Sequence, residues 1–150
     1  MKLYLRSAGL AVLIAVAAAQ MIQPDTSKQT ADPERSLWKD RRVDPRVADI
    51  LRRACANCHS YETKWPWYAR ISPVSWWLAR HVNQGRAKLN FDDWSSAAAT
   101  DQLEEMYDSI AKKKMPLASY LLMHPEARLS QADRDTLLAW TDGKPDHGSR

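Results

Sequence analysis

The stretch DPRVADILRRACANCH, residues 44–59, decides how this chain folds. Asp44 is a favourable helix N-cap residue, and Pro45 suits the first position of the helix that follows. Apolar residues then recur at the spacing of one helix face, namely Val47, Ile50, Leu51 and Ala54. The stretch therefore predicts an amphipathic helix that runs into Cys55, so that two cysteines and a histidine follow directly after a buried face.

Three further helices are predicted, and no segment shows the alternation of a strand. Ser72-Pro73 starts the first, Gly85 stops it, and its apolar face carries Val74, Trp77, Leu78, His81 and Val82. The second runs from about Thr100 to Lys113, with an inward face of Leu103, Met106, Tyr107 and Ile110. The third begins with a capping box of Ser130 and Asp133 and ends at Gly143 after Leu137, Leu138 and Trp140. The prediction is an all-α, cytochrome-c-like domain whose long loops, 60–71, 86–99 and 115–129, wrap a cofactor.

The N-terminal residues 1–22 read as an export signal peptide or an uncleaved membrane anchor. Lys2 and Arg6 precede an apolar run, and Ala17-Ala18-Ala19 offers a cleavage site of small residues. Residues 3–22 reach the ~20 residues that a spanning helix needs. We expect an exported protein on the periplasmic side of the cytoplasmic membrane, soluble or tethered. The polar residues 23–43 are expected to be a linker, 44–142 the folded domain and 143–150 a flexible tail.

Composition limits the classes of partner. The net charge is +4, but the stretch 1–19 holds two basic residues and no acid, which leaves 20 basic against 18 acidic groups. The longest basic run is Lys112-Lys113-Lys114, so nucleic acid is not expected as a partner. Seven tryptophans against one phenylalanine suggest that large rings line the binding site of a flat, apolar group, although these rings could equally fill a core.

Cys55, Cys58 and His59 form the C-x-x-C-H pattern that attaches c-type haem. Two thiols on one turn can reach the two vinyl groups of a porphyrin, and the next residue then projects its imidazole onto the iron. The alternatives are a thioredoxin-like redox pair in a βαβ unit, a structural disulfide, or a zinc site that adds two of His59, His81 and His124. Export favours haem attachment over these alternatives. The segment therefore predicts one covalent haem c with His59 as the proximal iron ligand.

The distal iron ligand is predicted to be Met115, which lies shortly before the last helix. A thioether opposite histidine stabilises ferrous iron and raises the reduction potential, which suits an electron carrier. His81 and His124 are alternative ligands, and an open site is the third possibility. An open or labile site would fit a peroxidase-like enzyme, whereas a closed one fits a carrier that is not an enzyme.

Neighbouring groups are expected to support the cofactor. A metal-bound imidazole usually donates its other N–H to a carbonyl, which we expect from the backbone near Pro66 or Pro73. The haem propionates need partners, and the candidates are Arg70, Arg80, Arg86, Lys88 and the indole N–H groups of Trp65 and Trp94. The four cations could instead form a solvated surface.

Motifs spread over about Ile22 to Thr141 resemble the haem-binding domain family of small bacterial c-type cytochromes. They are Cys55–Ser60, Trp65–Tyr68, Ser72–Trp77, His81–Arg86, Leu89–Phe91, Trp94, Met115–Tyr120, His124-Pro125, Leu129-Ser130 and Trp140. The resemblance implies haem binding, one-electron transfer with redox partner proteins that it does not identify, and an N-terminal membrane segment that is often kept.

Overall fold

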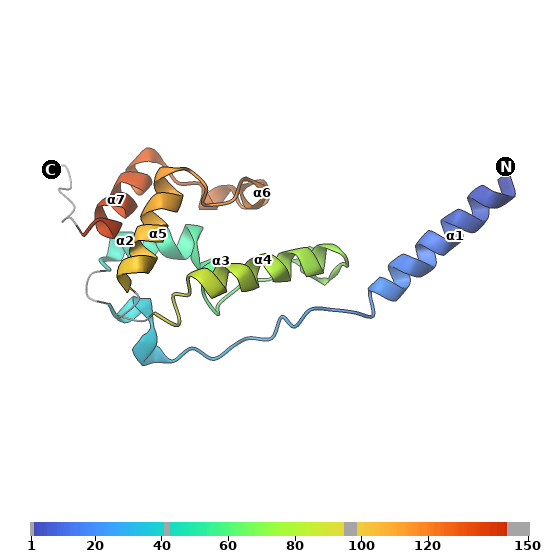
Figure 1. Cartoon of the computed structure of the whole chain (residues 1–150), viewed down its shortest axis with the longest axis horizontal. Helices are drawn as coiled ribbons and strands as arrows, with labels where there is room; N and C mark the ends of the chain where they lie inside the picture. Colours follow the sequence, from blue (N-terminus) through green and yellow to red (C-terminus); the bar gives the residue numbers. More distant parts are fainter. Residues whose placement is uncertain (1, 41–42, 95–98, 144–150) are drawn as a thin grey trace. The chain divides into compact units, whose positions relative to one another are not determined.

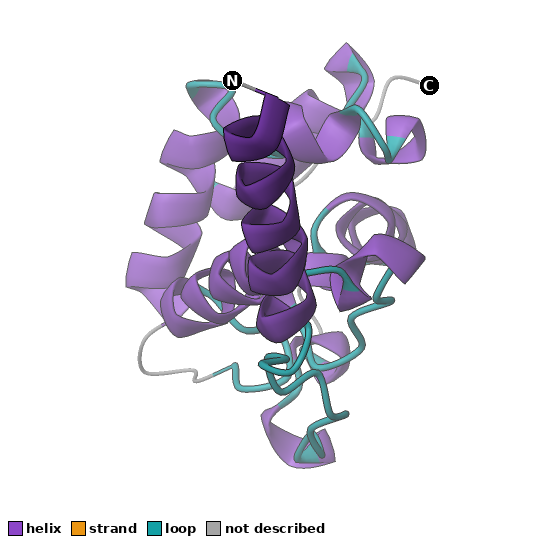
Figure 2. Cartoon of the chain, turned by 90° about the vertical axis from the view of Figure 1, so that its right-hand side faces the viewer, coloured by secondary structure: helices purple, strands orange, loops and turns teal. Residues whose placement is uncertain are grey.

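The computed structural model describes residues 2–40, 43–94 and 99–143, which form helices, turns and loops. No strand occurs among these residues, so the all-α prediction is confirmed (Figure 2). The α-helices are α1 (Lys2–Ala19), α2 (Pro45–Ala54), α3 (Ala56–His59), α4 (Val74–Lys88), α5 (Ala99–Ala111), α6 (Ala118–Leu121) and α7 (Gln131–Thr141) (Figure 1). Short 3₁₀ helices span Pro33–Arg35, Leu37–Lys39, Trp67–Arg70 and Pro125–Ala127.

The chain divides into two compact units. The smaller unit combines the residues up to Ser27 with Lys64–Gln84, and the larger combines Lys28–Thr63 with the residues from Gly85 onward. Helix α4 contributes to both units. The predicted boundaries at residues 22, 43 and 142 separate an export segment, a linker, a folded domain and a tail, whereas the two units are groups of residues in mutual contact. The predicted boundaries therefore stay a prediction.

The core of the larger unit forms where α2, α5 and α7 meet. Helices α5 and α7 pack together, and α2 contacts both α3 and α7. Helix α2 has the predicted N-cap, because the Asp44 carboxylate accepts hydrogen bonds from the backbone N–H groups of Arg46 and Val47. Its predicted apolar face is confirmed as well, since the buried residues of α2 are Val47, Ile50, Leu51 and Ala54. This face fixes α2 on the core, and the chain leaves the helix at Cys55.

Helix α7 begins with the predicted capping box. The Ser130 hydroxyl accepts a hydrogen bond from the Asp133 backbone N–H at 3.1 Å, and the Asp133 carboxylate accepts one from the Ser130 N–H at 2.9 Å. The helix ends as predicted near Gly143, whose φ of +68° belongs to the left-handed region that favours glycine.

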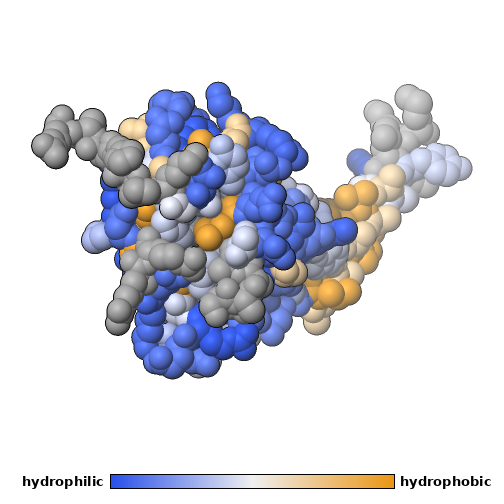
Figure 3. Space-filling model, turned by 60° about the vertical axis from the view of Figure 1, so that its left-hand side comes forward, coloured by the Kyte–Doolittle hydropathy of each residue, from blue (hydrophilic) through white to orange (hydrophobic). Residues whose placement is uncertain are grey.

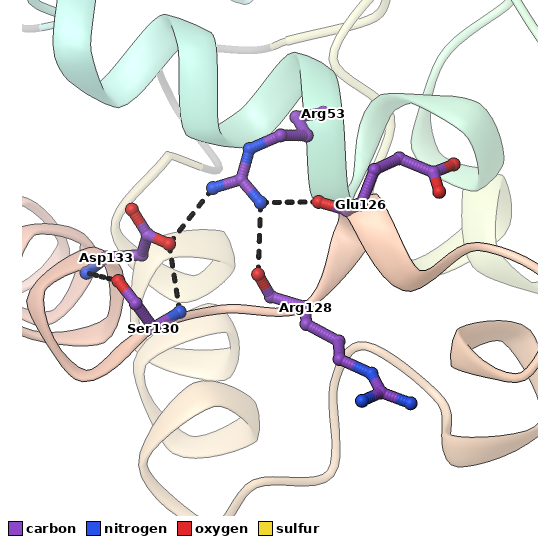
Figure 4. Close-up of polar contacts among 5 residues, drawn as sticks. All are labelled: Arg53, Glu126, Arg128, Ser130 and Asp133. Atoms are coloured by element: carbon purple, nitrogen blue, oxygen red, sulfur yellow. Dashed lines mark hydrogen bonds and ion pairs between the residues drawn. The ribbon is translucent and has the colours of Figure 1, made fainter.

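Arg53 ties the last turn of α2 to the start of α7. Its guanidinium donates to the Asp133 carboxylate at 3.0 Å and to the carbonyl oxygens of Glu126 and Arg128 at 2.6 and 3.0 Å (Figure 4). One side chain of α2 therefore fixes both the 3₁₀ turn at residues 125–127 and the capped end of α7.

Three predictions about helices are wrong in whole or in part. Gly85 does not stop α4, because its carbonyl accepts a hydrogen bond from the Leu89 N–H and the helix continues to Lys88. The buried residues of α4 are Ser75, Ala79 and Val82, whereas Val74 and Trp77 are exposed. On α5, Met106 and Ile110 are buried as predicted, but the Tyr107 side chain is 39% exposed.

The long loops are more structured than predicted, and wrapping of a cofactor by them stays a prediction. Residues 86–88 belong to α4, and the segment 115–129 contains α6 and a 3₁₀ turn. Within the expected linker, Leu37 is fully buried in the core, and its N–H donates to the Phe91 carbonyl at 2.7 Å. Of the expected tail, all but Gly143 lies outside the described residues.

Helix α1 carries exposed apolar side chains, including Leu10, Val12, Leu13, Ile14 and Val16. Hydrophobic residues, coloured orange, run along this part of the chain in Figure 3. Among the described residues, no helix is both long enough and apolar enough to cross a membrane.

Candidate haem site

A cavity in the larger unit lies beside the C-x-x-C-H segment. The cavity offers about 100 Å³ to the centre of a water-sized sphere, and the empty space is about 590 Å³ when the open mouth is included. The apolar part of its wall consists of Cys55, Leu89, Met106, Ile110 and Met115, and the polar part of His59, Lys88, Gln102, Glu105 and Ser109. Cys55 and His59 of the C-x-x-C-H segment thus share one cavity with Met115, which lies 56 positions further along the chain than His59.

The His59 imidazole is held on one side by backbone carbonyls from the end of α4. Its Nδ1 lies 3.1 Å from the carbonyl oxygen of Gly85 and 2.9 Å from that of Leu89. Because both oxygens can only accept, Nδ1 carries the hydrogen, and Nε2 is the nitrogen left to bind a metal. A carbonyl support was predicted near Pro66 or Pro73, but the structure assigns it to Gly85 and Leu89.

Gly85 and Phe91 fix the position of the same ring. A Cβ atom built on Gly85 would lie 3.4 Å from both His59 Cε1 and the Cys58 carbonyl oxygen, so the helix passes close to the histidine. The Phe91 N–H donates to the His59 carbonyl at 2.7 Å, and the two rings lie 6.0 Å apart between centroids. Phe91 is fully buried, which anchors this contact in the core.

Burial favours the neutral forms of His59 and of the two cysteines. Burial lowers the pKa of His59, although the carbonyls of Leu89 and Gly85 oppose part of this shift, so the imidazole is neutral and its Nε2 lone pair is available. Burial raises the pKa of the Cys55 thiol to about 12. Burial also raises the pKa of Cys58, although the positive charge of Arg86 opposes part of this shift. A reactive redox thiol needs a lowered pKa, so this environment does not suit a thioredoxin-like pair.

Met115 reaches the cavity because α5 ends abruptly before it. Lys113 adopts a φ of +53°, and the N–H groups of Lys114 and Met115 both donate to the Ser109 carbonyl. This turn folds the chain back along the end of α5 and brings Met115 into the wall with Met106 and Ile110. Its role as an iron ligand stays a prediction.

The two alternative ligands have other partners. His81 belongs to the smaller unit, where its Nδ1 lies 2.8 Å from the Trp77 carbonyl and its ring packs against the Trp77 ring. His124 is not among the described residues that line the cavity; it stacks on Tyr120 with 4.2 Å between centroids, and its Nδ1 lies 3.0 Å from the Glu126 carboxylate. Of the three predicted distal ligands, Met115 lies in the cavity wall, whereas His81 and His124 are not among the described residues that line it.

The candidate partners of the haem propionates lie in different places, and of the cations only Lys88 is among the described residues that line the cavity. Lys88 lines the cavity and lies 3.7 Å from the Glu105 carboxylate. Arg86 donates to the Ser60 carbonyl and the Thr63 hydroxyl, both at 2.8 Å, so it supports the loop after His59. Arg70 and Arg80 belong to the smaller unit, as does Trp65.

Three buried polar atoms of the larger unit lack a partner among the described residues, and one of them, Nη1 of Arg134, does not belong to the cavity wall. The other two are Nε1 of Trp94 and Oε1 of Gln102, and Gln102 lines the cavity. A buried amide oxygen without a partner is costly, and its place in the cavity wall indicates a polar group in the bound ligand or a water. Sequence reasoning missed Gln102, Glu105 and Ser109, although their spacing on α5 puts them on the side that also carries Met106.

These residues fit a haem. The wall contains the neutral His59 imidazole, whose Nδ1 is held by two carbonyls and whose Nε2 is left for a metal. It also contains the Met115 thioether, the Cys55 thiol, an apolar surface and several polar groups. A zinc site does not fit, because the part of the chain that the structure describes contains no group of three or more His, Cys, Asp or Glu side chains that could hold a metal. The two cysteines are not joined in a disulfide. In a haem protein, His59 and Met115 would face the iron, and the two thiols would hold the porphyrin.

The comparisons with known proteins agree with this fit. No curated protein and no solved structure matches the chain. The model of a family described as the haem-binding domain matches residues 14–143, which is most of the chain and includes every residue of the cavity wall. The chain belongs to the haem-binding domain family.

Proposed function

We propose that this haem protein is a mono-haem c-type cytochrome that carries single electrons on the periplasmic side of the cytoplasmic membrane. The observation that supports this best is the arrangement around His59. Its Nδ1 is engaged by the Gly85 and Leu89 carbonyls, and its ring lines a cavity that also contains Cys55 and Met115.

In this proposal Cys55 and Cys58 form thioether bonds to one haem, which supplies an iron that gains and loses one electron. The chain attaches, orients and insulates this group. The carbonyls of Gly85 and Leu89 hold the His59 ring in one orientation and make its Nε2 a better donor. Leu89, Met106 and Ile110 give the cavity an apolar wall that suits the faces of a porphyrin.

Met115 is proposed to set the function of the site. Its thioether would close the distal position, favour the ferrous state and raise the potential, which suits a carrier. The proposal therefore includes no catalytic residue, and it includes redox partner proteins that accept and supply the electron. The alternative is a peroxidase-like enzyme, which would require the distal position to be open or labile.

Absorption spectra of the ferric and ferrous protein test the proposal, because they report haem, its attachment and its axial ligands together. We expect low-spin iron in both states, a weak near-infrared methionine–iron band in the ferric state, and slow binding of carbon monoxide. A wild-type protein that is already high-spin and binds carbon monoxide at once would favour the peroxidase-like alternative.

A further inference from the structure

The smaller unit contains a segment with an unusual composition. Residues 64–84 hold four of the seven tryptophans, namely Trp65, Trp67, Trp76 and Trp77. The same residues include Lys64, Arg70 and Arg80 but no aspartate or glutamate. The segment is therefore rich in aromatic rings and carries charge of one sign, which tends to attract an anionic surface.

Many of these apolar side chains are exposed. The exposed fraction is 75% for Trp67, and the others are Trp77 at 47%, Ile71 at 44%, Val74 at 41% and Trp76 at 38%. We call these five residues the aromatic surface. Large rings left in water at successive turns of one segment indicate an interaction surface rather than a core.

The aromatic surface is joined to the end of α1 by hydrogen bonds. The Gln20 side-chain amide pairs with both backbone groups of Ser72, donating to its carbonyl and accepting from its N–H at 3.1 Å each. The indole N–H of Trp76 donates to the Ile22 carbonyl at 2.7 Å, and Gln23 donates to the Ser72 hydroxyl at 3.1 Å. The chain that follows α1 is thus part of the same structural unit as the exposed rings.

The exposed side chains of α1 indicate the kind of partner. Val12, Leu13 and Ile14 are consecutive, and with Leu10 and Val16 they spread over more than half of the helix circumference instead of forming one narrow stripe. A protein partner would cover one face of such a helix, whereas lipid can cover every side. Tryptophan and tyrosine are also enriched at membrane–water interfaces, where their rings are apolar and their N–H or O–H groups remain hydrated.

We propose that the aromatic surface docks on the headgroup region of an anionic phospholipid bilayer. The rings of Trp67, Trp76 and Trp77 enter the interface, and Arg70 and Arg80 contact lipid phosphates. This contact is separate from the apolar run of α1 and adds to it, so it holds the folded part of the smaller unit against the membrane. It does not depend on the redox role of the larger unit.

Flotation of the full-length protein with vesicles tests the proposal. One set of vesicles contains phosphatidylglycerol and phosphatidylcholine in equal parts, and the other contains phosphatidylcholine alone. The double variant Arg70→Gln/Arg80→Gln should bind the anionic vesicles about thirtyfold less tightly, because each cation near an anionic surface contributes roughly a fivefold factor. Its binding to phosphatidylcholine alone should change little, and added salt should remove the difference between the variant and the parent.

Matched variants separate the aromatic surface from α1 and from general charge. Lys112→Gln/Arg128→Gln removes the same charge from exposed positions of the larger unit, and it should bind like the parent. Trp67→Ser/Trp77→Ser should weaken binding to both kinds of vesicle severalfold, whereas Leu122→Ser, which removes an exposed apolar side chain of the larger unit, should not. If the cation and tryptophan variants float like the parent, then α1 alone holds the chain on lipid. The aromatic surface would then face a protein or solvent, and the proposal would be overturned.

Discussion

The carbonyl oxygen of Gly85 lies 3.1 Å from Nδ1 of His59, and a Cβ atom at Gly85 would lie 3.4 Å from Cε1 of the same ring. One glycine therefore both orients the imidazole and leaves room for it. Because Gly85 is within α4, the helix can approach the C-x-x-C-H segment without a side chain between them.

Substitutions at Gly85 should separate these two effects. In Gly85→Ala, the gain in helix propensity of about 1 kcal/mol offsets a tight but ordinary contact, so Tm and the spectrum should change little. In Gly85→Val, the extra methyl groups should displace the ring and shift the spectrum of the ferric protein. Asn83→Val, at an exposed position of the same helix, controls for the helix propensity of valine. Equal spectra for Gly85→Val and Asn83→Val would contradict the proposed close packing.

Arg53 should be important for stability, because it joins α2 to the segments around α7. In Arg53→Met, the carbonyls of Glu126 and Arg128 and the Asp133 carboxylate lose their shared donor, while the aliphatic part of the side chain remains. We expect a loss of about 2 kcal/mol in the free energy of unfolding, since the group is only partly exposed. Urea denaturation at pH 7 measures it, and a loss no larger than that of an exposed Lys112→Met would contradict this role.

The ionic part of that contribution should depend on pH. Burial raises the pKa of Asp133, but the hydrogen bonds from Ser130 and Arg53 outweigh it, and the pKa is lowered. A lowered pKa means that the carboxylate stabilises the fold above the ordinary value of about 3.9, and that this contribution is lost as the pH falls further. Asp133→Asn should thus be less stable than the parent at pH 7, and the difference should shrink below about pH 4. A difference that is independent of pH would show that the charge of Asp133 is not important.

The sequence predicts those parts of the fold that local rules determine. Asp44, Pro45 and the apolar face of α2 lie close together in the chain, and so do Ser130 and Asp133, so both helices could be located from their own residues. The prediction that Gly85 stops a helix is wrong because the role of Gly85 depends on His59, which lies 26 positions away and comes close only after folding. The sequence around Leu37 indicates a linker because its polar neighbours have no periodicity, whereas the partners that bury Leu37, such as Phe91, are distant in sequence.

The site shows the same division. Cys55, Cys58 and His59 form a local pattern, and Met115 could be suggested from its place before the last helix. The cavity itself, the carbonyls that hold His59 and the unpartnered oxygen of Gln102 depend on contacts between residues that are far apart in the sequence. Such contacts have no signal in a single sequence.

Leu37 provides a test of where the folded part begins. Its side chain is fully buried in the core of the larger unit, so Leu37→Ala should leave a cavity and cost about 2–5 kcal/mol. Thermal or urea denaturation measures this loss. Lys39→Ala, two residues further along the same 3₁₀ helix but exposed, is the control. Equal stability of the two variants would mean that residues 37–39 behave as a linker.

Met115 and Met106 both line the cavity, which provides a matched pair of variants. Met115→Ala should open the distal position, remove the near-infrared band, lower the potential and create peroxidase activity that the parent lacks. Met106→Leu removes a thioether from the same wall but keeps its volume, and it should leave the spectrum unchanged. If His81 or His124 were the ligand, Met115→Ala would keep the parent spectrum and the matching His→Ala would give high-spin iron.

The central claim is that Cys55 and Cys58 hold one haem covalently, and the mass of the denatured polypeptide tests it most directly. The parent, produced with haem and extracted with acid acetone, should keep a mass increase of one haem and its colour on a denaturing gel. Cys55→Ala or Cys58→Ala should weaken the attachment, and the double variant should abolish it. A parent chain that has the mass of the polypeptide alone, with its haem in the acetone, would contradict the account.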